Sequence, residues 1–124
     1  MKINMSTNED MERVLDVLNK AVDIDASAVV SRDGKLKAAK IPPSLHPEVF
    51  GAMSVTMLVA AETAVEELKK GLTDLIIVQT KEAKIIVMEA GPTALLVTMT
   101  SRKAMLGFIL LEMERTIGKI KALV

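Results

Sequence analysis

The chain has 124 residues, half of them hydrophobic, and its 16 basic residues balance its 16 acidic residues. A neutral chain offers no electric field that would attract DNA, RNA or an anionic membrane. Two phenylalanines and no tyrosine or tryptophan leave almost no aromatic surface for stacking unpaired bases. Because cysteine is absent, disulfides, thiolate metal sites and cysteine nucleophiles are excluded. The length fits one compact domain, which we expect to span residues 1–124.

Signals for secretion or membrane insertion are missing from the sequence. Residues 6–12 are polar, where a signal peptide would place its apolar core. A small secreted domain usually needs disulfide bonds, which this chain cannot form. The longest uncharged stretch, residues 49–61, is too short to cross a bilayer. We therefore expect a soluble, cytoplasmic protein that does not insert into membranes.

The first predicted element is a helix over residues 8–21. Ser6 and Glu9 have the spacing of a capping box, in which a hydroxyl and a carboxylate satisfy the first backbone amides of a helix. Hydrophobic residues then follow at the spacing of one helical face. They are Met11, Val14, Leu15, Leu18 and Val22.

A β-hairpin is predicted next. Residues 26–31 are typical of a strand, and residues 36–40 of its return strand. Asp33 and Gly34 lie between the two strands. This pair favours a tight hairpin turn, because such turns need positive φ angles at their centre.

A second, long helix is predicted over residues 47–70. Pro47 suits its first turn, where a missing amide hydrogen costs nothing. Lys69 and Lys70 favour its C-terminal end through the helix dipole. Gly71 is then expected to close the helix in the left-handed conformation.

Three strands and a last helix complete the predicted chain. Apolar runs at residues 75–78, 85–88 and 95–97 predict the strands, with turns between them. Ser101 is expected to cap the last helix, whose inner face is marked by hydrophobic residues at helical spacing. Those residues are Met105, Ile109, Met113, Ile117 and Ile120. The predicted order is therefore α-β-β-α-β-β-β-α.

The last three strands predict how the elements are layered. Their apolar residues are continuous, whereas a strand with one face in water alternates apolar and polar residues. The sheet should therefore be covered on both faces. With three helices available, the simplest α/β arrangement of the α+β type has three layers. One helix then covers one face of the sheet and two helices cover the other.

The second helix carries more apolar surface than one contact with a sheet requires. Residues 49–61 include no charge, although the outer face of a helix on a sheet is normally charged. Large exposed apolar patches are rare on monomers. We therefore predict that the outer face, with Ala52, Val55 and Val59, is buried against a second copy of the chain rather than inside its own domain. The stripe expected to face the sheet is Val49, Met53, Met57, Ala60, Ala64 and Leu68.

Two of the predicted strands differ in how they would protect a sheet edge. The return strand of the hairpin carries Lys37 and Lys40, and lysines keep an edge from pairing with other chains. Residues 74–79 have no charge between their ends, so this strand would be an unprotected edge. Such an edge invites pairing with another chain, and we add Leu75 and Ile77 to the predicted dimer interface.

These features resemble the Roadblock/dynein light-chain family. The resemblance rests on residues 29–34 (Val-Val-Ser-Arg-Asp-Gly), on the long helix rich in small residues, and on the apolar strands around Gly91 and Pro92. It implies a five-stranded, mainly antiparallel sheet with helices on both faces. It also implies dimers in which the second helix and the third strand pair with their copies, giving a continuous sheet of ten strands.

The resemblance also implies a function. Family members serve as dynein light chains, as scaffold subunits for small Ras-like GTPases, and in bacteria as GTPase-activating partners of a polarity GTPase. Our first hypothesis is therefore a homodimer that binds and regulates a small Ras-like GTPase. The second is a structural adaptor without a nucleotide-dependent partner. A small-molecule sensor is the third, for which the apolar strands offer few polar residues that would orient a ligand.

A GTPase is expected to bind on the ridge formed by two paired second helices. Polar groups around a drier centre are typical of the rim of an interface. Arg32 has no evident reason to lie at that ridge, so we do not expect an arginine to be donated to the GTPase. The candidate contacts are Glu48, Ser54, Glu62 and Glu66.

No catalytic residue, cofactor or metal site is expected. His46, the only histidine, precedes a proline that suits a helix start, and we interpret it as a loop or cap residue. Asp23 and Asp25 lack the spacing of a calcium loop and a histidine partner. A Walker loop and a dinucleotide fingerprint are absent, so the chain itself should not hydrolyse GTP. We interpret one basic cluster as a solvated strand edge: Arg32, Lys35, Lys37 and Lys40.

Overall fold

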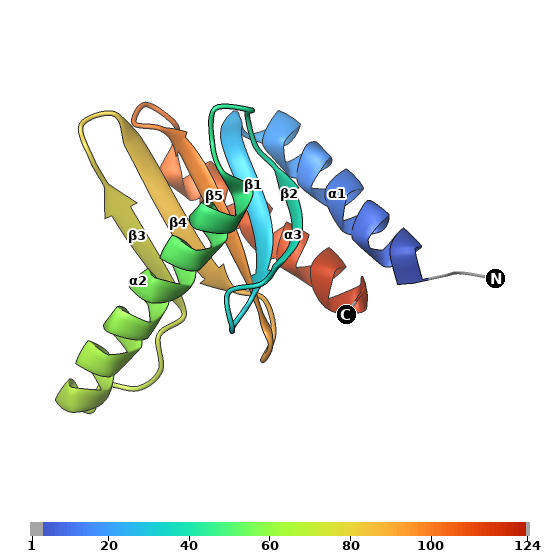
Figure 1. Ribbon diagram of the computed structural model, residues 1–124. Coiled ribbons are helices and arrows are strands. Elements are labelled where there is room, and N and C mark those ends of the chain that lie inside the picture. The colour runs from blue at the N-terminus through green and yellow to red at the C-terminus, as the bar shows by residue number, and fades with distance from the viewer. Residues whose placement is uncertain (1–3, 124) are drawn as a thin grey trace.

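The computed structural model describes residues 4–123, which form three helices and five strands (Figure 1). The helices are α1 (Asn4–Ala21), α2 (Pro47–Leu68) and α3 (Leu106–Leu123). The strands are β1 (Ile24–Ser31), β2 (Leu36–Lys40), β3 (Leu75–Gln79), β4 (Ala83–Glu89) and β5 (Ala94–Ser101). The predicted order of elements is confirmed.

The five strands form one sheet in the order β2-β1-β5-β4-β3, and every neighbouring pair is antiparallel. Helix α2 crosses one face of the sheet, and α1 and α3 cover the other (Figure 1). The predicted α+β fold with three layers is therefore confirmed. The lysine-bearing strand β2 and the charge-free strand β3 are the two edges, as their residues indicated.

Neighbouring residues of each inner strand point into two different cores. In β4, Ile86 and Met88 join the core beneath α1 and α3, whereas Val87 joins the core beneath α2. Because both faces are covered, both sets of side chains must be apolar, which explains the continuous apolar runs. The buried members of the α2-side core are Ala28, Val30, Leu58, Val87, Leu95 and Val97.

The hairpin between β1 and β2 turns as its sequence indicated. Gly34 has a φ of +92°, a conformation that favours glycine, and its amide donates to the carbonyl of Ser31 at 2.9 Å. The carboxylate of Asp33 accepts a hydrogen bond from the hydroxyl of Ser31 and another from the backbone amide of Lys35. These hydrogen bonds hold the pKa of Asp33 below its ordinary value of 3.8, and the bond from Ser31 has the largest effect.

The ends of the first two helices differ from the prediction. Helix α1 begins at Asn4, so Ser6 lies inside the helix rather than at its N-cap. Helix α2 ends at Leu68, and Lys69 closes it with a left-handed φ of +52°. Gly71 also has a positive φ but lies beyond the end of the helix.

Ser101 does not cap the last helix. It is the last residue of β5, where it pairs with Ala83, and α3 begins only at Leu106. The prediction was wrong because the pairing of β5 with β4 continues through this residue. Met105 therefore precedes α3 and is mostly exposed, whereas the other four predicted inner residues of the helix are buried.

The stripe predicted to bring α2 onto the sheet is also wrong. The buried residues are Gly51, Ser54 and Leu58, at helical spacing, whereas Val49 and Met53 of the predicted stripe are exposed. A side-chain carbon on Gly51 would lie 3.4 Å from both γ-carbons of Val30, an ordinary contact distance, so the helix lies directly against the sheet at this position. Because α2 is apolar on more than one face, hydrophobicity alone did not select the face that meets the sheet.

Candidate functional site

The outward face of α2 is largely apolar, and its side chains are exposed in the described part of the protomer. Its polar residues are Thr56, Thr63 and, near its end, the exposed Glu67. The hydroxyls of the two threonines donate to the carbonyls of Ala52 and Val59, one turn earlier, at 2.9 Å in both cases. The two threonine hydroxyls therefore donate within the helix rather than to water. Its large side chains have high exposed fractions: Val49 57%, Met53 59%, Val59 53% and Leu68 68%.

Strand β3 presents an open edge. Among residues 4–123 it pairs with β4 only, so the backbone groups on its other side have no partner strand there. Ile77 is exposed, and the strand from Leu75 to Gln79 carries no charge. Figure 1 shows the open edge on the same side of the molecule as the end of α2 that projects beyond the sheet. The helix face and the strand edge are thus available to the same partner.

The structure places the five predicted dimer residues on these two elements. Ala52 and Val59 are exposed on α2, whereas Val55 is half-buried against the core beneath the helix. Ile77 is exposed on β3, and Leu75 is half-buried against the core on the α1–α3 side. The open part of the predicted interface is therefore formed by Ala52, Val59 and Ile77.

The four predicted partner contacts separate into two groups. Glu48 and Glu66 are exposed, and Glu62 is half-buried. Ser54 is only 1% exposed, and its hydroxyl donates to the carbonyl of Phe50 at 2.7 Å. Because Ser54 lies on the sheet-facing side of α2, its assignment to an exposed ridge is wrong, and we remove it from the candidate contacts.

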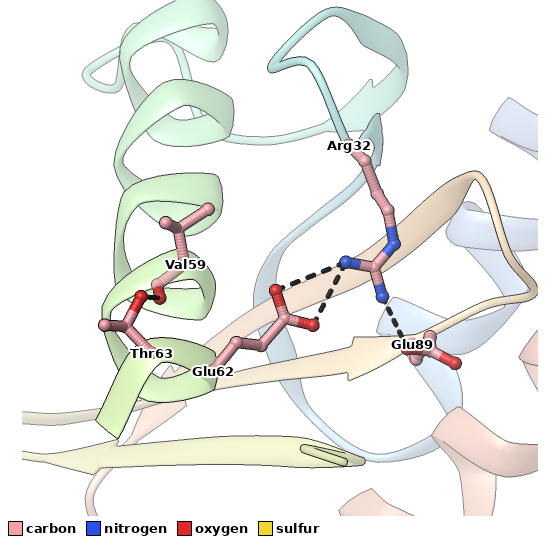
Figure 2. A network of polar contacts seen from close by, with 5 residues as sticks. All are labelled: Arg32, Val59, Glu62, Thr63 and Glu89. Atoms are coloured by element: carbon pink, nitrogen blue, oxygen red, sulfur yellow. Dashed lines mark hydrogen bonds and ion pairs between the residues drawn. The ribbon is translucent and has the colours of Figure 1, made fainter. Parts of the chain in front are cut away.

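Arg32 lies beside α2, which the sequence did not indicate. Figure 2 shows its guanidinium between Glu62 of α2 and Glu89 at the end of β4. One guanidinium nitrogen lies 3.1 and 3.4 Å from the two carboxylate oxygens of Glu62, and the other nitrogen lies 2.5 Å from Glu89. These residues are 30 and 57 positions from Arg32 in the chain, so no local pattern could have revealed the network.

A hollow of about 420 Å³ lies between the second half of α2 and the segment that leads into β3. Leu72 on its rim is 94% exposed. Glu62 and Glu66 contribute the charge of the hollow. The hollow is therefore an acidic site with an apolar projection, adjacent to the outward face of the helix.

The model of the Roadblock/LC7 domain matches residues 10–100, which is most of the chain. The chain belongs to the Roadblock/LC7 family. The resemblance inferred from the residues alone is thus confirmed.

This Roadblock/LC7 chain is also similar to other proteins in sequence and in fold. The uncharacterized protein MJ0310 of Methanocaldococcus jannaschii is 35% identical over 113 residues, covering 91% of this chain and 98% of its own. The structure of MglB from Myxococcus xanthus has a TM-score of 0.86 at 13% identity, covering 94% of this chain and 92% of that one. A structure described as MglB with tetrameric arrangement has a TM-score of 0.85 at 19% identity, covering 94% and 89%.

Other candidate positions of the Roadblock/LC7 chain have ordinary surroundings. His46 is the exposed N-cap residue of α2, and its side chain makes no capping hydrogen bond. Within residues 4–123, no group of three or more His, Asp and Glu side chains is arranged to hold a metal ion. By length and composition alone α2 could cross a membrane, but a single helix of this kind is weak evidence of a membrane span. A protein partner that covers the apolar surface of α2 would explain this surface without a membrane.

Proposed function

We propose that this chain is a single Roadblock domain that forms a cytoplasmic homodimer and regulates a small Ras-like GTPase, without catalytic activity of its own. One observation carries the proposal: an unpartnered apolar helix face and an open strand edge lie on the same side of the molecule. Membership of the Roadblock/LC7 family supports the class of partner, since the resemblance implies that such domains act as scaffolds or activating partners of small Ras-like GTPases.

The proposed dimer uses β3 and α2 together. Antiparallel pairing of β3 with its copy would satisfy the open backbone groups and extend the sheet from five strands to ten. The same two-fold axis would bring α2 beside its copy and cover Val49, Met53 and Val59. The description of an MglB structure as tetrameric supports self-association in this fold. Pairing also accounts for the apolar surface of α2 without a membrane.

The GTPase would bind the ridge formed by the two α2 helices. Glu48 and Glu66 are exposed and would form a polar rim around the paired apolar faces. We expect the module to act by holding the switch loops of the GTPase in position. It would not donate an arginine, because Arg32 beside the helix is already held by two carboxylates.

Calorimetry tests this proposal with the wild-type protein and a small Ras-like GTPase from the same organism. The GTPase is loaded with GDP in one series and with a non-hydrolysable GTP analogue in the other. We expect binding that depends on the nucleotide. Glu66→Lys should weaken it mainly by slowing association, with an effect that shrinks as salt is added. Glu12→Lys, on the exposed side of α1 behind the sheet, is the matched control and should leave binding unchanged.

Each outcome has a definite meaning. Absence of binding in both nucleotide states would contradict a role with that GTPase. Equal binding in both states would favour the structural adaptor. Binding that is weakened by Glu12→Lys but not by Glu66→Lys would place the contact on the other face of the sheet.

A further inference from the structure

Arg32 makes the only ion pairs among the described residues that join different elements. The pairs Arg13–Asp10, Lys20–Asp16 and Arg115–Glu112 each lie within one helix, at a spacing of three or four residues. Arg32 follows β1 directly and pairs with both α2 and the end of β4 (Figure 2). Its backbone amide also donates to the carbonyl of Thr93 at 3.1 Å, which fixes the base of the side chain.

The second half of α2 has few other attachments to the sheet. The buried residues of the helix, Gly51, Ser54 and Leu58, all lie in its first twelve positions. Beyond Leu58 the side chains are half-buried at most, and the last turns project beyond the sheet (Figure 1). The contact of Arg32 with Glu62 is thus a specific polar attachment in the part of the helix that apolar packing holds least.

The chemistry of this attachment suits a positioning role. A guanidinium is planar and carries several fixed donors, so it can bind two carboxylates at once, which an ammonium group does less well. The side chains of Arg32 and Glu62 are each about one-third exposed. Partly exposed pairs contribute little to global stability. The pair can nevertheless determine the angle of a helix segment that has few other contacts with the sheet.

We propose that Arg32 is a positioning residue: it holds the second half of α2 against the sheet and so sets the geometry of the α2 surface used for dimerisation and partner binding. The link to dimerisation rests on the proposed function. The effect of Arg32 on the helix does not rest on the proposed function, because it concerns contacts within one protomer.

Hydrogen exchange of backbone amides tests the local effect directly. In Arg32→Ala, amides over residues 61–68 should exchange several-fold faster, while those over residues 51–58 stay unchanged. Arg32→Lys should give an intermediate rate, because it keeps the charge but not the fork of donors. The matched control is Arg115→Ala, which removes the ion pair with Glu112 on α3 and should not affect α2. The melting temperature confirms that each variant is folded.

The dimer dissociation constant tests the functional link. We expect it to rise roughly five-fold in Arg32→Ala, from the usual strength of partly exposed charge pairs. Glu89→Ala should have a smaller effect that is not additive with that of Arg32→Ala, because both changes act through one network. Glu89 is suitable for this cycle because it lies at the end of β4, off the proposed ridge.

Two results would overturn the inference. Unchanged exchange over residues 61–68 in a folded Arg32→Ala protein would show that the network does not hold the helix. Faster exchange with an unaltered dissociation constant would show that the orientation of the helix does not govern the interface. A monomeric wild type would instead contradict the proposed function, and the exchange data alone would then decide the role of Arg32.

Discussion

Leu58 and Val59 are adjacent residues of α2 with opposite surroundings, and replacing each by alanine should separate folding from association. Leu58 is 2% exposed and lies in the core beneath the helix, whereas Val59 is 53% exposed on the outward face. Leu58→Ala removes three buried carbon atoms, worth about 2.4 kcal/mol at ~0.8 kcal/mol for each buried methylene group. The cavity left behind raises the expected loss of unfolding free energy to about 3 kcal/mol.

Urea unfolding measures this loss. With a urea dependence of roughly 1.5–2 kcal/mol per molar, the midpoint of Leu58→Ala should fall by about 1.5–2 M. The fall should be similar at every protein concentration, because the missing contacts lie within one protomer. Val59→Ala should change the unfolding of the protomer by less than about 0.5 kcal/mol. It should lower the apparent stability only where the dimer is populated, since association stabilises by mass action.

The refuting results are clear for this pair. A loss below about 1 kcal/mol in Leu58→Ala would show that this residue is not the main apolar attachment of α2. A concentration-independent loss of similar size in Val59→Ala would show that the outward face is buried within the protomer.

Three further changes test other parts of the structure. Hydrogen bonds from Ser31 and from the amide of Lys35 lower the pKa of Asp33, so the unfolded chain binds more protons in acid. The contribution of Asp33 is therefore complete above about pH 4 and is lost as pH falls through the folded pKa, and Asp33→Asn should flatten the acid side of a stability profile. Lys84 is buried, and its ammonium donates to the carbonyls of Arg102 and Ala104 at 2.5 and 2.8 Å. Lys84→Met should cost about 1–3 kcal/mol in thermal unfolding, because it leaves these carbonyls without their donor. His46→Ala should change the melting temperature and GTPase binding very little, since its side chain makes no capping hydrogen bond.

The sequence predicted the sheet well because its strands carry strong local signals. The continuous apolar residues of β4 and β5 indicated a sheet covered on both faces, and the two cores confirm this. The Asp33–Gly34 turn and the contrast in charge between β2 and β3 identified the hairpin and both edges. These features depend on residues that are close in the chain.

The errors arose where local signals were ambiguous or absent. Helix α2 has apolar residues on both its inner and outer faces, so periodicity favoured the wrong stripe. The small residues Gly51 and Ser54 were the signals in the sequence that could have indicated the face that meets the sheet. Ser101 resembled a helix cap, but pairing across the sheet kept it in β5. The contact of Arg32 with Glu62 joins residues 30 positions apart, and only the tertiary structure brings them together.

The mass of the protein in solution tests the central claim most directly. The chain has a mass of 13.4 kDa, and sedimentation equilibrium at micromolar concentration should give about twice that value for the wild type. Val59→Asp places a charge in the proposed interface, where burial without a partner is costly, and should give a folded protein of the single-chain mass. A wild type that sediments as a monomer, or a Val59→Asp protein that remains a dimer, would contradict the account.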